Sequence, residues 1–118
     1  MRYMMLIRVD RSTAPSEVPD DALMEDIGKV IEDMTKAGAL LDTAGLRPIT
    51  EATRISLSGG KQTVLDGPFT ESKEVIGGYC LLQAKSKEEA VEWSSRFLGA
   101  HGPEWEIDLE IRQLDDPA

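Results

Sequence analysis

The sequence predicts a single α+β domain spanning residues 1–118, in which two helices cover one face of an antiparallel sheet. Three observations lead to this prediction. The chain of 118 residues is near the usual size of one domain and can bury one core. Strand-like and helix-like segments alternate along it without a repeat or a linker. Two of the predicted strands are apolar on both faces, which is typical of the middle of a covered sheet.

The first part of the chain predicts a strand, a helix and a second strand. Residues 3–9 form an apolar run of strand length. After a polar loop, Asp20 or Asp21 can cap a helix, because either side chain can accept from a free backbone N–H. Gly38 ends this helix, and residues 39–46 form the next strand. The apolar face of the helix consists of Leu23, Ile27, Val30, Ile31 and Met34.

The middle of the chain predicts a hairpin and a further buried strand. Residues 53–58 and 62–65 flank a Gly-Gly-Lys turn at residues 59–61. Residues 66–69, Asp-Gly-Pro-Phe, have the composition of a turn. Residues 76–84 follow as a strand with apolar side chains on both faces.

The last part of the chain predicts a helix and an edge strand. Ser86 and Glu89 form a capping box, in which Ser86 caps the helix and Glu89 reaches back to the N–H of Ser86. Gly99 ends that helix. Apolar and charged residues alternate over residues 105–112, which predicts a strand with one face in water.

Two interleaved β-α-β units with strand order 4-1-3-2 account for this succession, giving a ferredoxin-like split β-α-β sheet with an extra hairpin. Residues 3–9 and 76–84 then lie in the middle of the sheet. Two helices cover only one sheet face, so the other face exposes apolar side chains that normally mark an interface. We therefore expect a homodimer that forms a dimeric α+β barrel. A ligand cavity between the two sheets would be lined by the same side chains.

The composition excludes several classes of partner. The net charge is −9, and without a run of basic residues the chain lacks the means to neutralise nucleic acid phosphates or anionic membranes. The apolar stretch at the start is too short for a signal peptide or a membrane span, so we expect a cytoplasmic protein. The single cysteine, Cys80, cannot form an intrachain disulfide and is expected to be a buried thiol.

The sequence offers no metal set, nucleophile–base triad, phosphate loop or dinucleotide fingerprint, so we expect no metal and no cofactor. The candidate ligand-binding residues instead follow from connectivity, which brings them to one end of the sheet. These candidates are Arg8, Asp66, Phe69, Glu71, Lys73 and His101.

Each candidate also has a structural interpretation. Asp66 can bond the backbone of its own turn, or it can bind a ligand or transfer protons. Phe69 can pack in the core or in a dimer contact. Glu71 and Lys73 share a face of an extended segment, where they form an ion pair or bind a polar substrate group. His101, the only histidine, is either a surface loop residue or part of the site.

The paired glycines at residues 77–78 interrupt a buried strand, where glycine lowers stability. Either close packing of a helix, or a bulge, or a ligand lying on the sheet requires the missing side chains.

The run at residues 66–74, followed by Gly77-Gly78-Tyr79, resembles the signature of the YCII-related (DGPF) family. The first strand and the closing Glu110-Ile111-Arg112 are also similar, so the resemblance covers nearly the whole chain. It implies a ferredoxin-like fold and a dimer, whereas most of the family has no assigned reaction. Some members resemble products encoded beside extracytoplasmic-function sigma factors.

In a shorter branch of the family, a histidine near the start of the first helix and a partner aspartate look like an active-site pair. Here Asp20, Asp21 and Ala22 stand near that point, so the pair is not carried over. Two hypotheses follow. The chain binds a small molecule between the sheet and the residue 66–69 segment, with or without acid–base chemistry. Alternatively, it is a non-catalytic regulatory or protein-interaction module associated with sigma-factor-linked transcription control.

Overall fold

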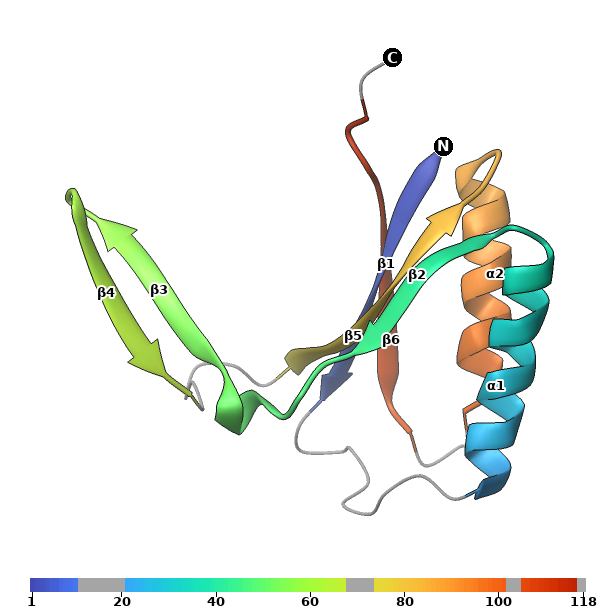
Figure 1. The fold of residues 1–118 in the computed structure, drawn as a ribbon, viewed down its shortest axis with the longest axis horizontal. Helices are drawn as coiled ribbons and strands as arrows, with labels where there is room; N and C mark the ends of the chain where they lie inside the picture. The colour runs from blue at the N-terminus through green and yellow to red at the C-terminus, as the bar shows by residue number, and fades with distance from the viewer. Residues whose placement is uncertain (11–20, 68–73, 102–104, 117–118) are drawn as a thin grey trace.

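The computed structural model describes residues 1–10, 21–67, 74–101 and 105–116, which form a two-layer domain and a projecting hairpin (Figure 1). The strands are β1 (Arg2–Asp10), β2 (Leu40–Gly45), β3 (Thr53–Ser58), β4 (Lys61–Asp66), β5 (Glu74–Gln83) and β6 (Ile107–Gln113). The helices are α1 (Asp21–Lys36) and α2 (Lys87–Gly99), and a short 3-10 turn, η1 (Ile49–Glu51), precedes β3.

The main sheet has the order β2-β5-β1-β6, and all three neighbouring pairs are antiparallel. This order confirms the predicted interleaving of two β-α-β units, with the two strands that are apolar on both faces in the middle. The register between β1 and β5 shifts once, between Ile7 and Arg8. Gly77 of β5 is the extra residue at that shift, because Gly78 pairs with Ile7 and Ile76 pairs with Arg8.

Both helices lie on the same face of the sheet (Figure 1), and the core lies between the two layers. The sheet contributes alternate residues of β1 and β5, as the two-residue period of a strand requires. The most deeply buried large side chains are Met5, Met34, Cys80 and Leu82. Burying a side chain of Met or Leu size stabilises the fold by about 1.5–3 kcal/mol, so this layer holds the domain together.

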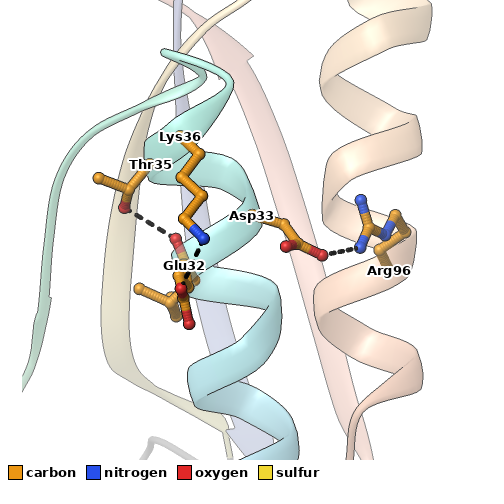
Figure 2. A network of polar contacts seen from close by, with 6 residues as sticks. Glu32, Asp33, Thr35, Lys36 and Arg96 are labelled. Carbon is orange, nitrogen blue, oxygen red and sulfur yellow. Dashed lines mark hydrogen bonds and ion pairs between the residues drawn. The ribbon is translucent and has the colours of Figure 1, made fainter.

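An exposed ion pair joins the two helices (Figure 2). Arg96 of α2 donates to Asp33 of α1, with 2.7 Å between Nη2 and Oδ2. The Arg96 guanidinium also lies 4.9 Å from the centre of the Trp93 ring. Within α1, Lys36 and Glu32 form a second exposed pair at 2.8 Å, one turn apart (Figure 2). Such surface pairs contribute under about 1 kcal/mol each to the stability of the fold, so they are minor compared with the core.

The helix ends follow the predicted signals with one correction. Gly38 has a φ of 72°, the left-handed conformation that ends α1. Ser86 caps α2, and its hydroxyl accepts from the Glu89 N–H at 3.2 Å. The Glu89 carboxylate, however, accepts from the N–H of Lys85 at 3.2 Å, where the sequence predicted the N–H of Ser86. The carboxylate thus bonds the backbone one residue before the cap.

The sheet face opposite the helices is here called the open face. Register places Met4 and Leu6 of β1 beside Leu81 and Tyr79 of β5 on this face. Ile76 lies near its end and is 47% exposed. Charged side chains surround this apolar centre, including the ion pair between Arg8 and Glu110 at 3.3 Å. The predicted apolar second face is therefore present.

Strands β3 and β4 form a two-stranded sheet of their own, here called the arm (residues 53–66). The arm projects from the end of the main sheet, on the side opposite the helices (Figure 1). The predicted hairpin is confirmed, and its turn has positive φ at Gly59 and Gly60. Lys61, which the sequence analysis placed in the turn, instead begins β4 and pairs with Ser58. The arm and the main sheet meet at η1, which is where the candidate site begins.

Candidate functional site

A cavity of about 260 Å³ lies where the arm leaves the main sheet, and it is here called the hinge pocket. Its walls come from the segment after β2, from η1 and from the start of β5. The lining residues are Leu46, Arg47, Pro48, Ile49, Glu51, Ala52, Ile76 and Gly77. Most of them are apolar, and a concave, mainly apolar pocket with a few polar groups is the usual form of a small-molecule site.

Backbone hydrogen bonds hold the walls of this pocket together. The Leu46 N–H donates to the Gly77 carbonyl at 2.9 Å, which joins the segment after β2 to β5. In η1, the Glu51 N–H donates to the Pro48 carbonyl at 2.9 Å. Because Pro48 lacks a backbone donor and has a restricted φ, it suits the start of this turn. The pocket is thus shaped mainly by main-chain contacts.

The Asp66-Gly67 step is held against the same wall. The Gly67 N–H donates to the Ala52 carbonyl at 2.7 Å. A Cβ atom at Gly67 would lie 2.5 Å from the Ile49 carbonyl oxygen, closer than the packing allows. Glycine is therefore required here, because the chain passes directly over η1. The start of the predicted residue 66–69 turn forms the outer support of the hinge pocket.

The paired glycines of β5 have different roles. Gly78 lies against β2, where an added Cβ would come within 2.8 Å of the Ala44 carbonyl oxygen. Gly77 is the extra residue at the register shift and also lines the hinge pocket, where an added Cβ would meet Val9 at 3.4 Å. Close packing against the neighbouring strand β2 explains Gly78, where the sequence predicted close packing of a helix. Gly77 combines the predicted bulge with a pocket position.

The polar group of the pocket is the ion pair of Arg47 and Glu51. The guanidinium Nε lies 3.1 Å from Oε2, and Nη2 lies 3.3 Å from Oε1, so the pairing is two-pronged. The Arg47 side chain is 83% exposed and remains accessible to a ligand. The sequence reasoning missed both residues, although their spacing of four positions on a turn was a usable signal.

The structure describes three of the predicted site residues, and each of them has different neighbours. Arg8 is on the open face, paired with Glu110. Asp66 ends β4 and accepts from the Thr53 hydroxyl at 3.1 Å. His101 follows α2 on the helix side, with Nδ1 at 3.1 Å from the Phe97 carbonyl oxygen. None of the three is among the described residues that line the hinge pocket.

His101 is half-buried between two aromatic rings. Its ring centre lies 5.2 Å from that of Phe97 and 6.0 Å from that of Trp105, both with edge-to-face geometry. The sheet separates it from Arg8. The remaining predicted residues, Phe69, Glu71 and Lys73, lie outside the described residues.

Two neighbouring side chains in the middle of β5 have raised pKa values. The Tyr79 hydroxyl donates to Asp42 at 3.0 Å, and this hydrogen bond raises the pKa of Tyr79 above its ordinary value. Burial raises the pKa of the Cys80 thiol, while a hydrogen bond with Thr43 acts in the opposite direction. The raised pKa of each residue favours its protonated form, which is neither a base nor a nucleophile.

In the described parts of the chain, His, Cys, Asp and Glu side chains do not form a group of three that could hold a metal ion. Neither of the described helices has the length and apolarity needed to cross a membrane.

Comparisons with known proteins agree with the resemblance seen in the sequence. The model of a family described as the YCII-related domain matches residues 1–104. A curated protein of Rhizobium meliloti (strain 1021), described as uncharacterized, is 35% identical over 103 residues. The match covers 86% of this chain and 83% of that protein.

Proposed function

The chain belongs to the YCII-related domain family, and from this premise we propose that it binds a small molecule in the hinge pocket. The observation that carries the proposal is a cavity of about 260 Å³ with apolar walls and a single ion pair at its edge. This volume lies near the lower end of the range for ligand sites. It suits a compact molecule of a few carbon atoms with one polar group.

The ion pair indicates which polar group the ligand carries. Arg47 presents a planar donor set that matches a carboxylate, and Glu51 occupies that set in this structure. A small carboxylic acid would compete with Glu51 for Arg47 while its apolar part contacts Ile49 and Ile76. Glu51 is the only carboxylate among the described lining residues, so any acid–base chemistry in the pocket would use it.

Methyl NMR tests the proposal directly. With isotope-labelled isoleucine methyl groups, Ile49 and Ile76 report on the pocket, and Ile31 of α1 serves as an internal reference. We expect isovalerate and benzoate to shift the two pocket methyl groups saturably and to leave Ile31 unchanged. If no acid or matching primary amide shifts either pocket signal at millimolar concentration, the hinge pocket is not a small-molecule site.

A pair of variants tests the role of the cation. Arg47→Gln should weaken binding of the acids about three- to ten-fold and leave the amides unaffected, because one exposed charged contact contributes about 1 kcal/mol. Arg96→Gln is the matched control, since Arg96 forms a similar exposed ion pair on the helix layer. Equal effects of both variants would show that general charge, and not the pocket, determines the binding.

We also propose that a second copy of the chain covers the open face. Met4, Leu6, Leu81, Tyr79 and Ile76 form an apolar centre on that face, and the helices cover only the opposite one. Closed two-fold pairs are the commonest oligomers, and facing sheets of this kind would complete an α+β barrel. Because Ile76 belongs both to this face and to the hinge pocket, a second copy would lie close to the pocket opening.

Two substitutions test this pairing without damaging the monomer. Leu6→Lys places a cation opposite Glu110, and Leu81→Lys places one opposite Asp42, so both are compensated within a single chain. Sedimentation should give twice the chain mass of 13.0 kDa for the parent and the single mass for the double variant. A parent chain that sediments as a monomer at micromolar concentration would contradict the proposal.

The second candidate function is a non-catalytic regulatory or protein-interaction module, including one linked to sigma-factor control. The exposed apolar side chains of the arm favour it, because such surfaces normally contact another molecule. The methyl NMR experiment separates the two candidates, since an interaction module needs no ligand response at Ile49 and Ile76.

A further inference from the structure

We infer that the arm is a second contact surface, which binds another copy of this chain through the face that carries Ile55, Leu57 and Val64. The inference rests on the homodimer proposed above and extends it, because the open face alone does not involve the arm. Three features of the arm support this inference: its exposed apolar face, the absence of a third strand beside it among the described residues, and its length.

The arm has one apolar face and one mainly polar face. Ile55 and Val64 are directly opposed across the hairpin, and Leu57 is the next residue of β3 on the same side. Their side chains are 67%, 67% and 72% exposed. The opposite face carries Ser56, Ser58, Lys61 and Thr63, together with Leu65 beside Arg54. A ribbon in water on both sides gains nothing from three apolar residues on one side, so this pattern indicates a contact.

The arm also lacks the support that a two-stranded sheet needs. An isolated hairpin is at best marginally stable in water, and stability comes from a third strand or from packing against another element. In the described chain, β3 and β4 pair only with each other. Their anchor is the base, where the Gly67 N–H bonds to the Ala52 carbonyl at 2.7 Å. Beyond that base, the described residues give β3 and β4 no further strand, which supports a contact supplied by another chain.

The chain is also more extended, and exposes more surface, than a compact domain of its length. Its radius of gyration is 16.2 Å, against about 13.5 Å for a compact domain of this length. Its accessible surface is 8241 Å², against about 6,300 Å² for a folded monomer of this mass. The difference of roughly 1,900 Å² exceeds the ~800 Å² that one partner buries in a standard interface. The surplus is therefore large enough for an interface of standard size.

The reach of the arm identifies the second copy as its partner. Two sheets packed face to face lie about 10 Å apart. The arm projects on the open-face side (Figure 1), and a six-residue strand extends about 20 Å. An arm of that length passes beside a chain seated on the open face. By two-fold symmetry each arm then contacts the other chain.

A matched pair of double variants tests the inference by sedimentation equilibrium. Ile55→Asp with Val64→Lys places opposite charges across the apolar face, so the hairpin keeps a favourable cross-strand pair. Ser56→Asp with Thr63→Lys places the same charges on the neighbouring pair of the other face. We expect the first variant to raise the dimer dissociation constant at least ten-fold and the second to change it less than three-fold.

Equal dissociation constants for the parent and both double variants would overturn the role of the arm. The open-face dimer is tested separately by the lysine variants described above. A monomeric parent would overturn both.

An independent measurement avoids substitutions in the apolar face. A nitroxide attached through Ser58→Cys at the arm tip, in unlabelled chains mixed with nitrogen-15-labelled parent chains, should broaden amide signals of the labelled partner outside its own arm. The native Cys80 is fully buried and does not interfere. Absence of any intermolecular broadening at concentrations where the parent is dimeric would overturn the inference.

Discussion

Cys80 is the most fully enclosed reactive side chain among the described residues, with 0% exposure in the central strand β5. Its burial raises the pKa of the thiol, and its sulfur lies 3.2 Å from the Thr43 hydroxyl. The thiolate is the reactive form, and both access and ionisation are unfavourable here. Cys80 is therefore a structural residue of the core.

We expect Cys80 to resist labelling by Ellman's reagent at pH 8 for an hour in the native protein. In denaturant one equivalent should react within seconds, because burial is then removed. Absorbance at 412 nm measures both reactions. Stoichiometric labelling of the native protein within seconds would contradict the position of Cys80 in the core.

Tyr79 gives a pH-dependent signal on the open face. Its pKa is raised by the hydrogen bond to Asp42, so the bond stabilises the folded state at pH below the unfolded tyrosine value of about 10. This contribution is lost as the pH rises through the folded pKa of Tyr79. We expect Asp42→Asn to lower that pKa toward its ordinary value.

Phenolate absorbance at 295 nm measures this titration, and Tyr79→Phe identifies the component that belongs to Tyr79. Asp33→Asn is the control, because it removes an equally exposed carboxylate on α1. An unchanged titration in Asp42→Asn would show that the bond does not persist in solution.

At the scale of elements, the junction between the arm and the sheet depends on Gly67. The chain passes so close to η1 that a Cβ atom at Gly67 would lie 2.5 Å from the Ile49 carbonyl oxygen and 3.1 Å from that of Ala52. Backbone oxygens cannot move aside as a flexible side chain can. The hinge pocket and the arm therefore depend on the same close contact.

We expect Gly67→Ala to lower the free energy of unfolding by about 1–3 kcal/mol, the usual cost of overpacking. Gly28→Ala is the control, because Gly28 lies in α1 with nothing within 4 Å of its added Cβ. That change should raise stability by about 0.5–1 kcal/mol through helix propensity. Urea unfolding measures both, and a neutral Gly67→Ala would show that η1 and the arm base separate easily.

At the scale of the whole molecule, the two sides of the sheet have different roles. The helix side holds the core and the Asp33–Arg96 pair, whereas the open face and the arm lie on the other side (Figure 1). The hinge pocket lies where the arm leaves the sheet. The extents of 46 × 43 × 18 Å reflect this one-sided projection. Ligand binding and self-association are thus proposed for the same side, where Ile76 contributes to both surfaces.

The sequence by itself determined the helices, the strands and their order, because burial leaves a local period along the chain. The two-sided apolar character of residues 3–9 and 76–84 correctly predicted the central strands β1 and β5. The alternation in residues 105–112 correctly predicted the edge strand β6. The Ser86 cap was likewise readable from adjacent residues.

Only the tertiary structure decided where the candidate site lies. The hinge pocket joins two stretches of the chain, residues 46–52 and 76–77, and contacts such as that of Gly67 with Ile49 have no local period that a sequence could display. Connectivity placed Arg8 and His101 at one end of the sheet, but it did not show that the sheet lies between them. The periodicity of apolar side chains shows which face of a helix or strand is buried. A cavity depends instead on how segments far apart in the sequence pack against one another, and a local pattern does not contain that information.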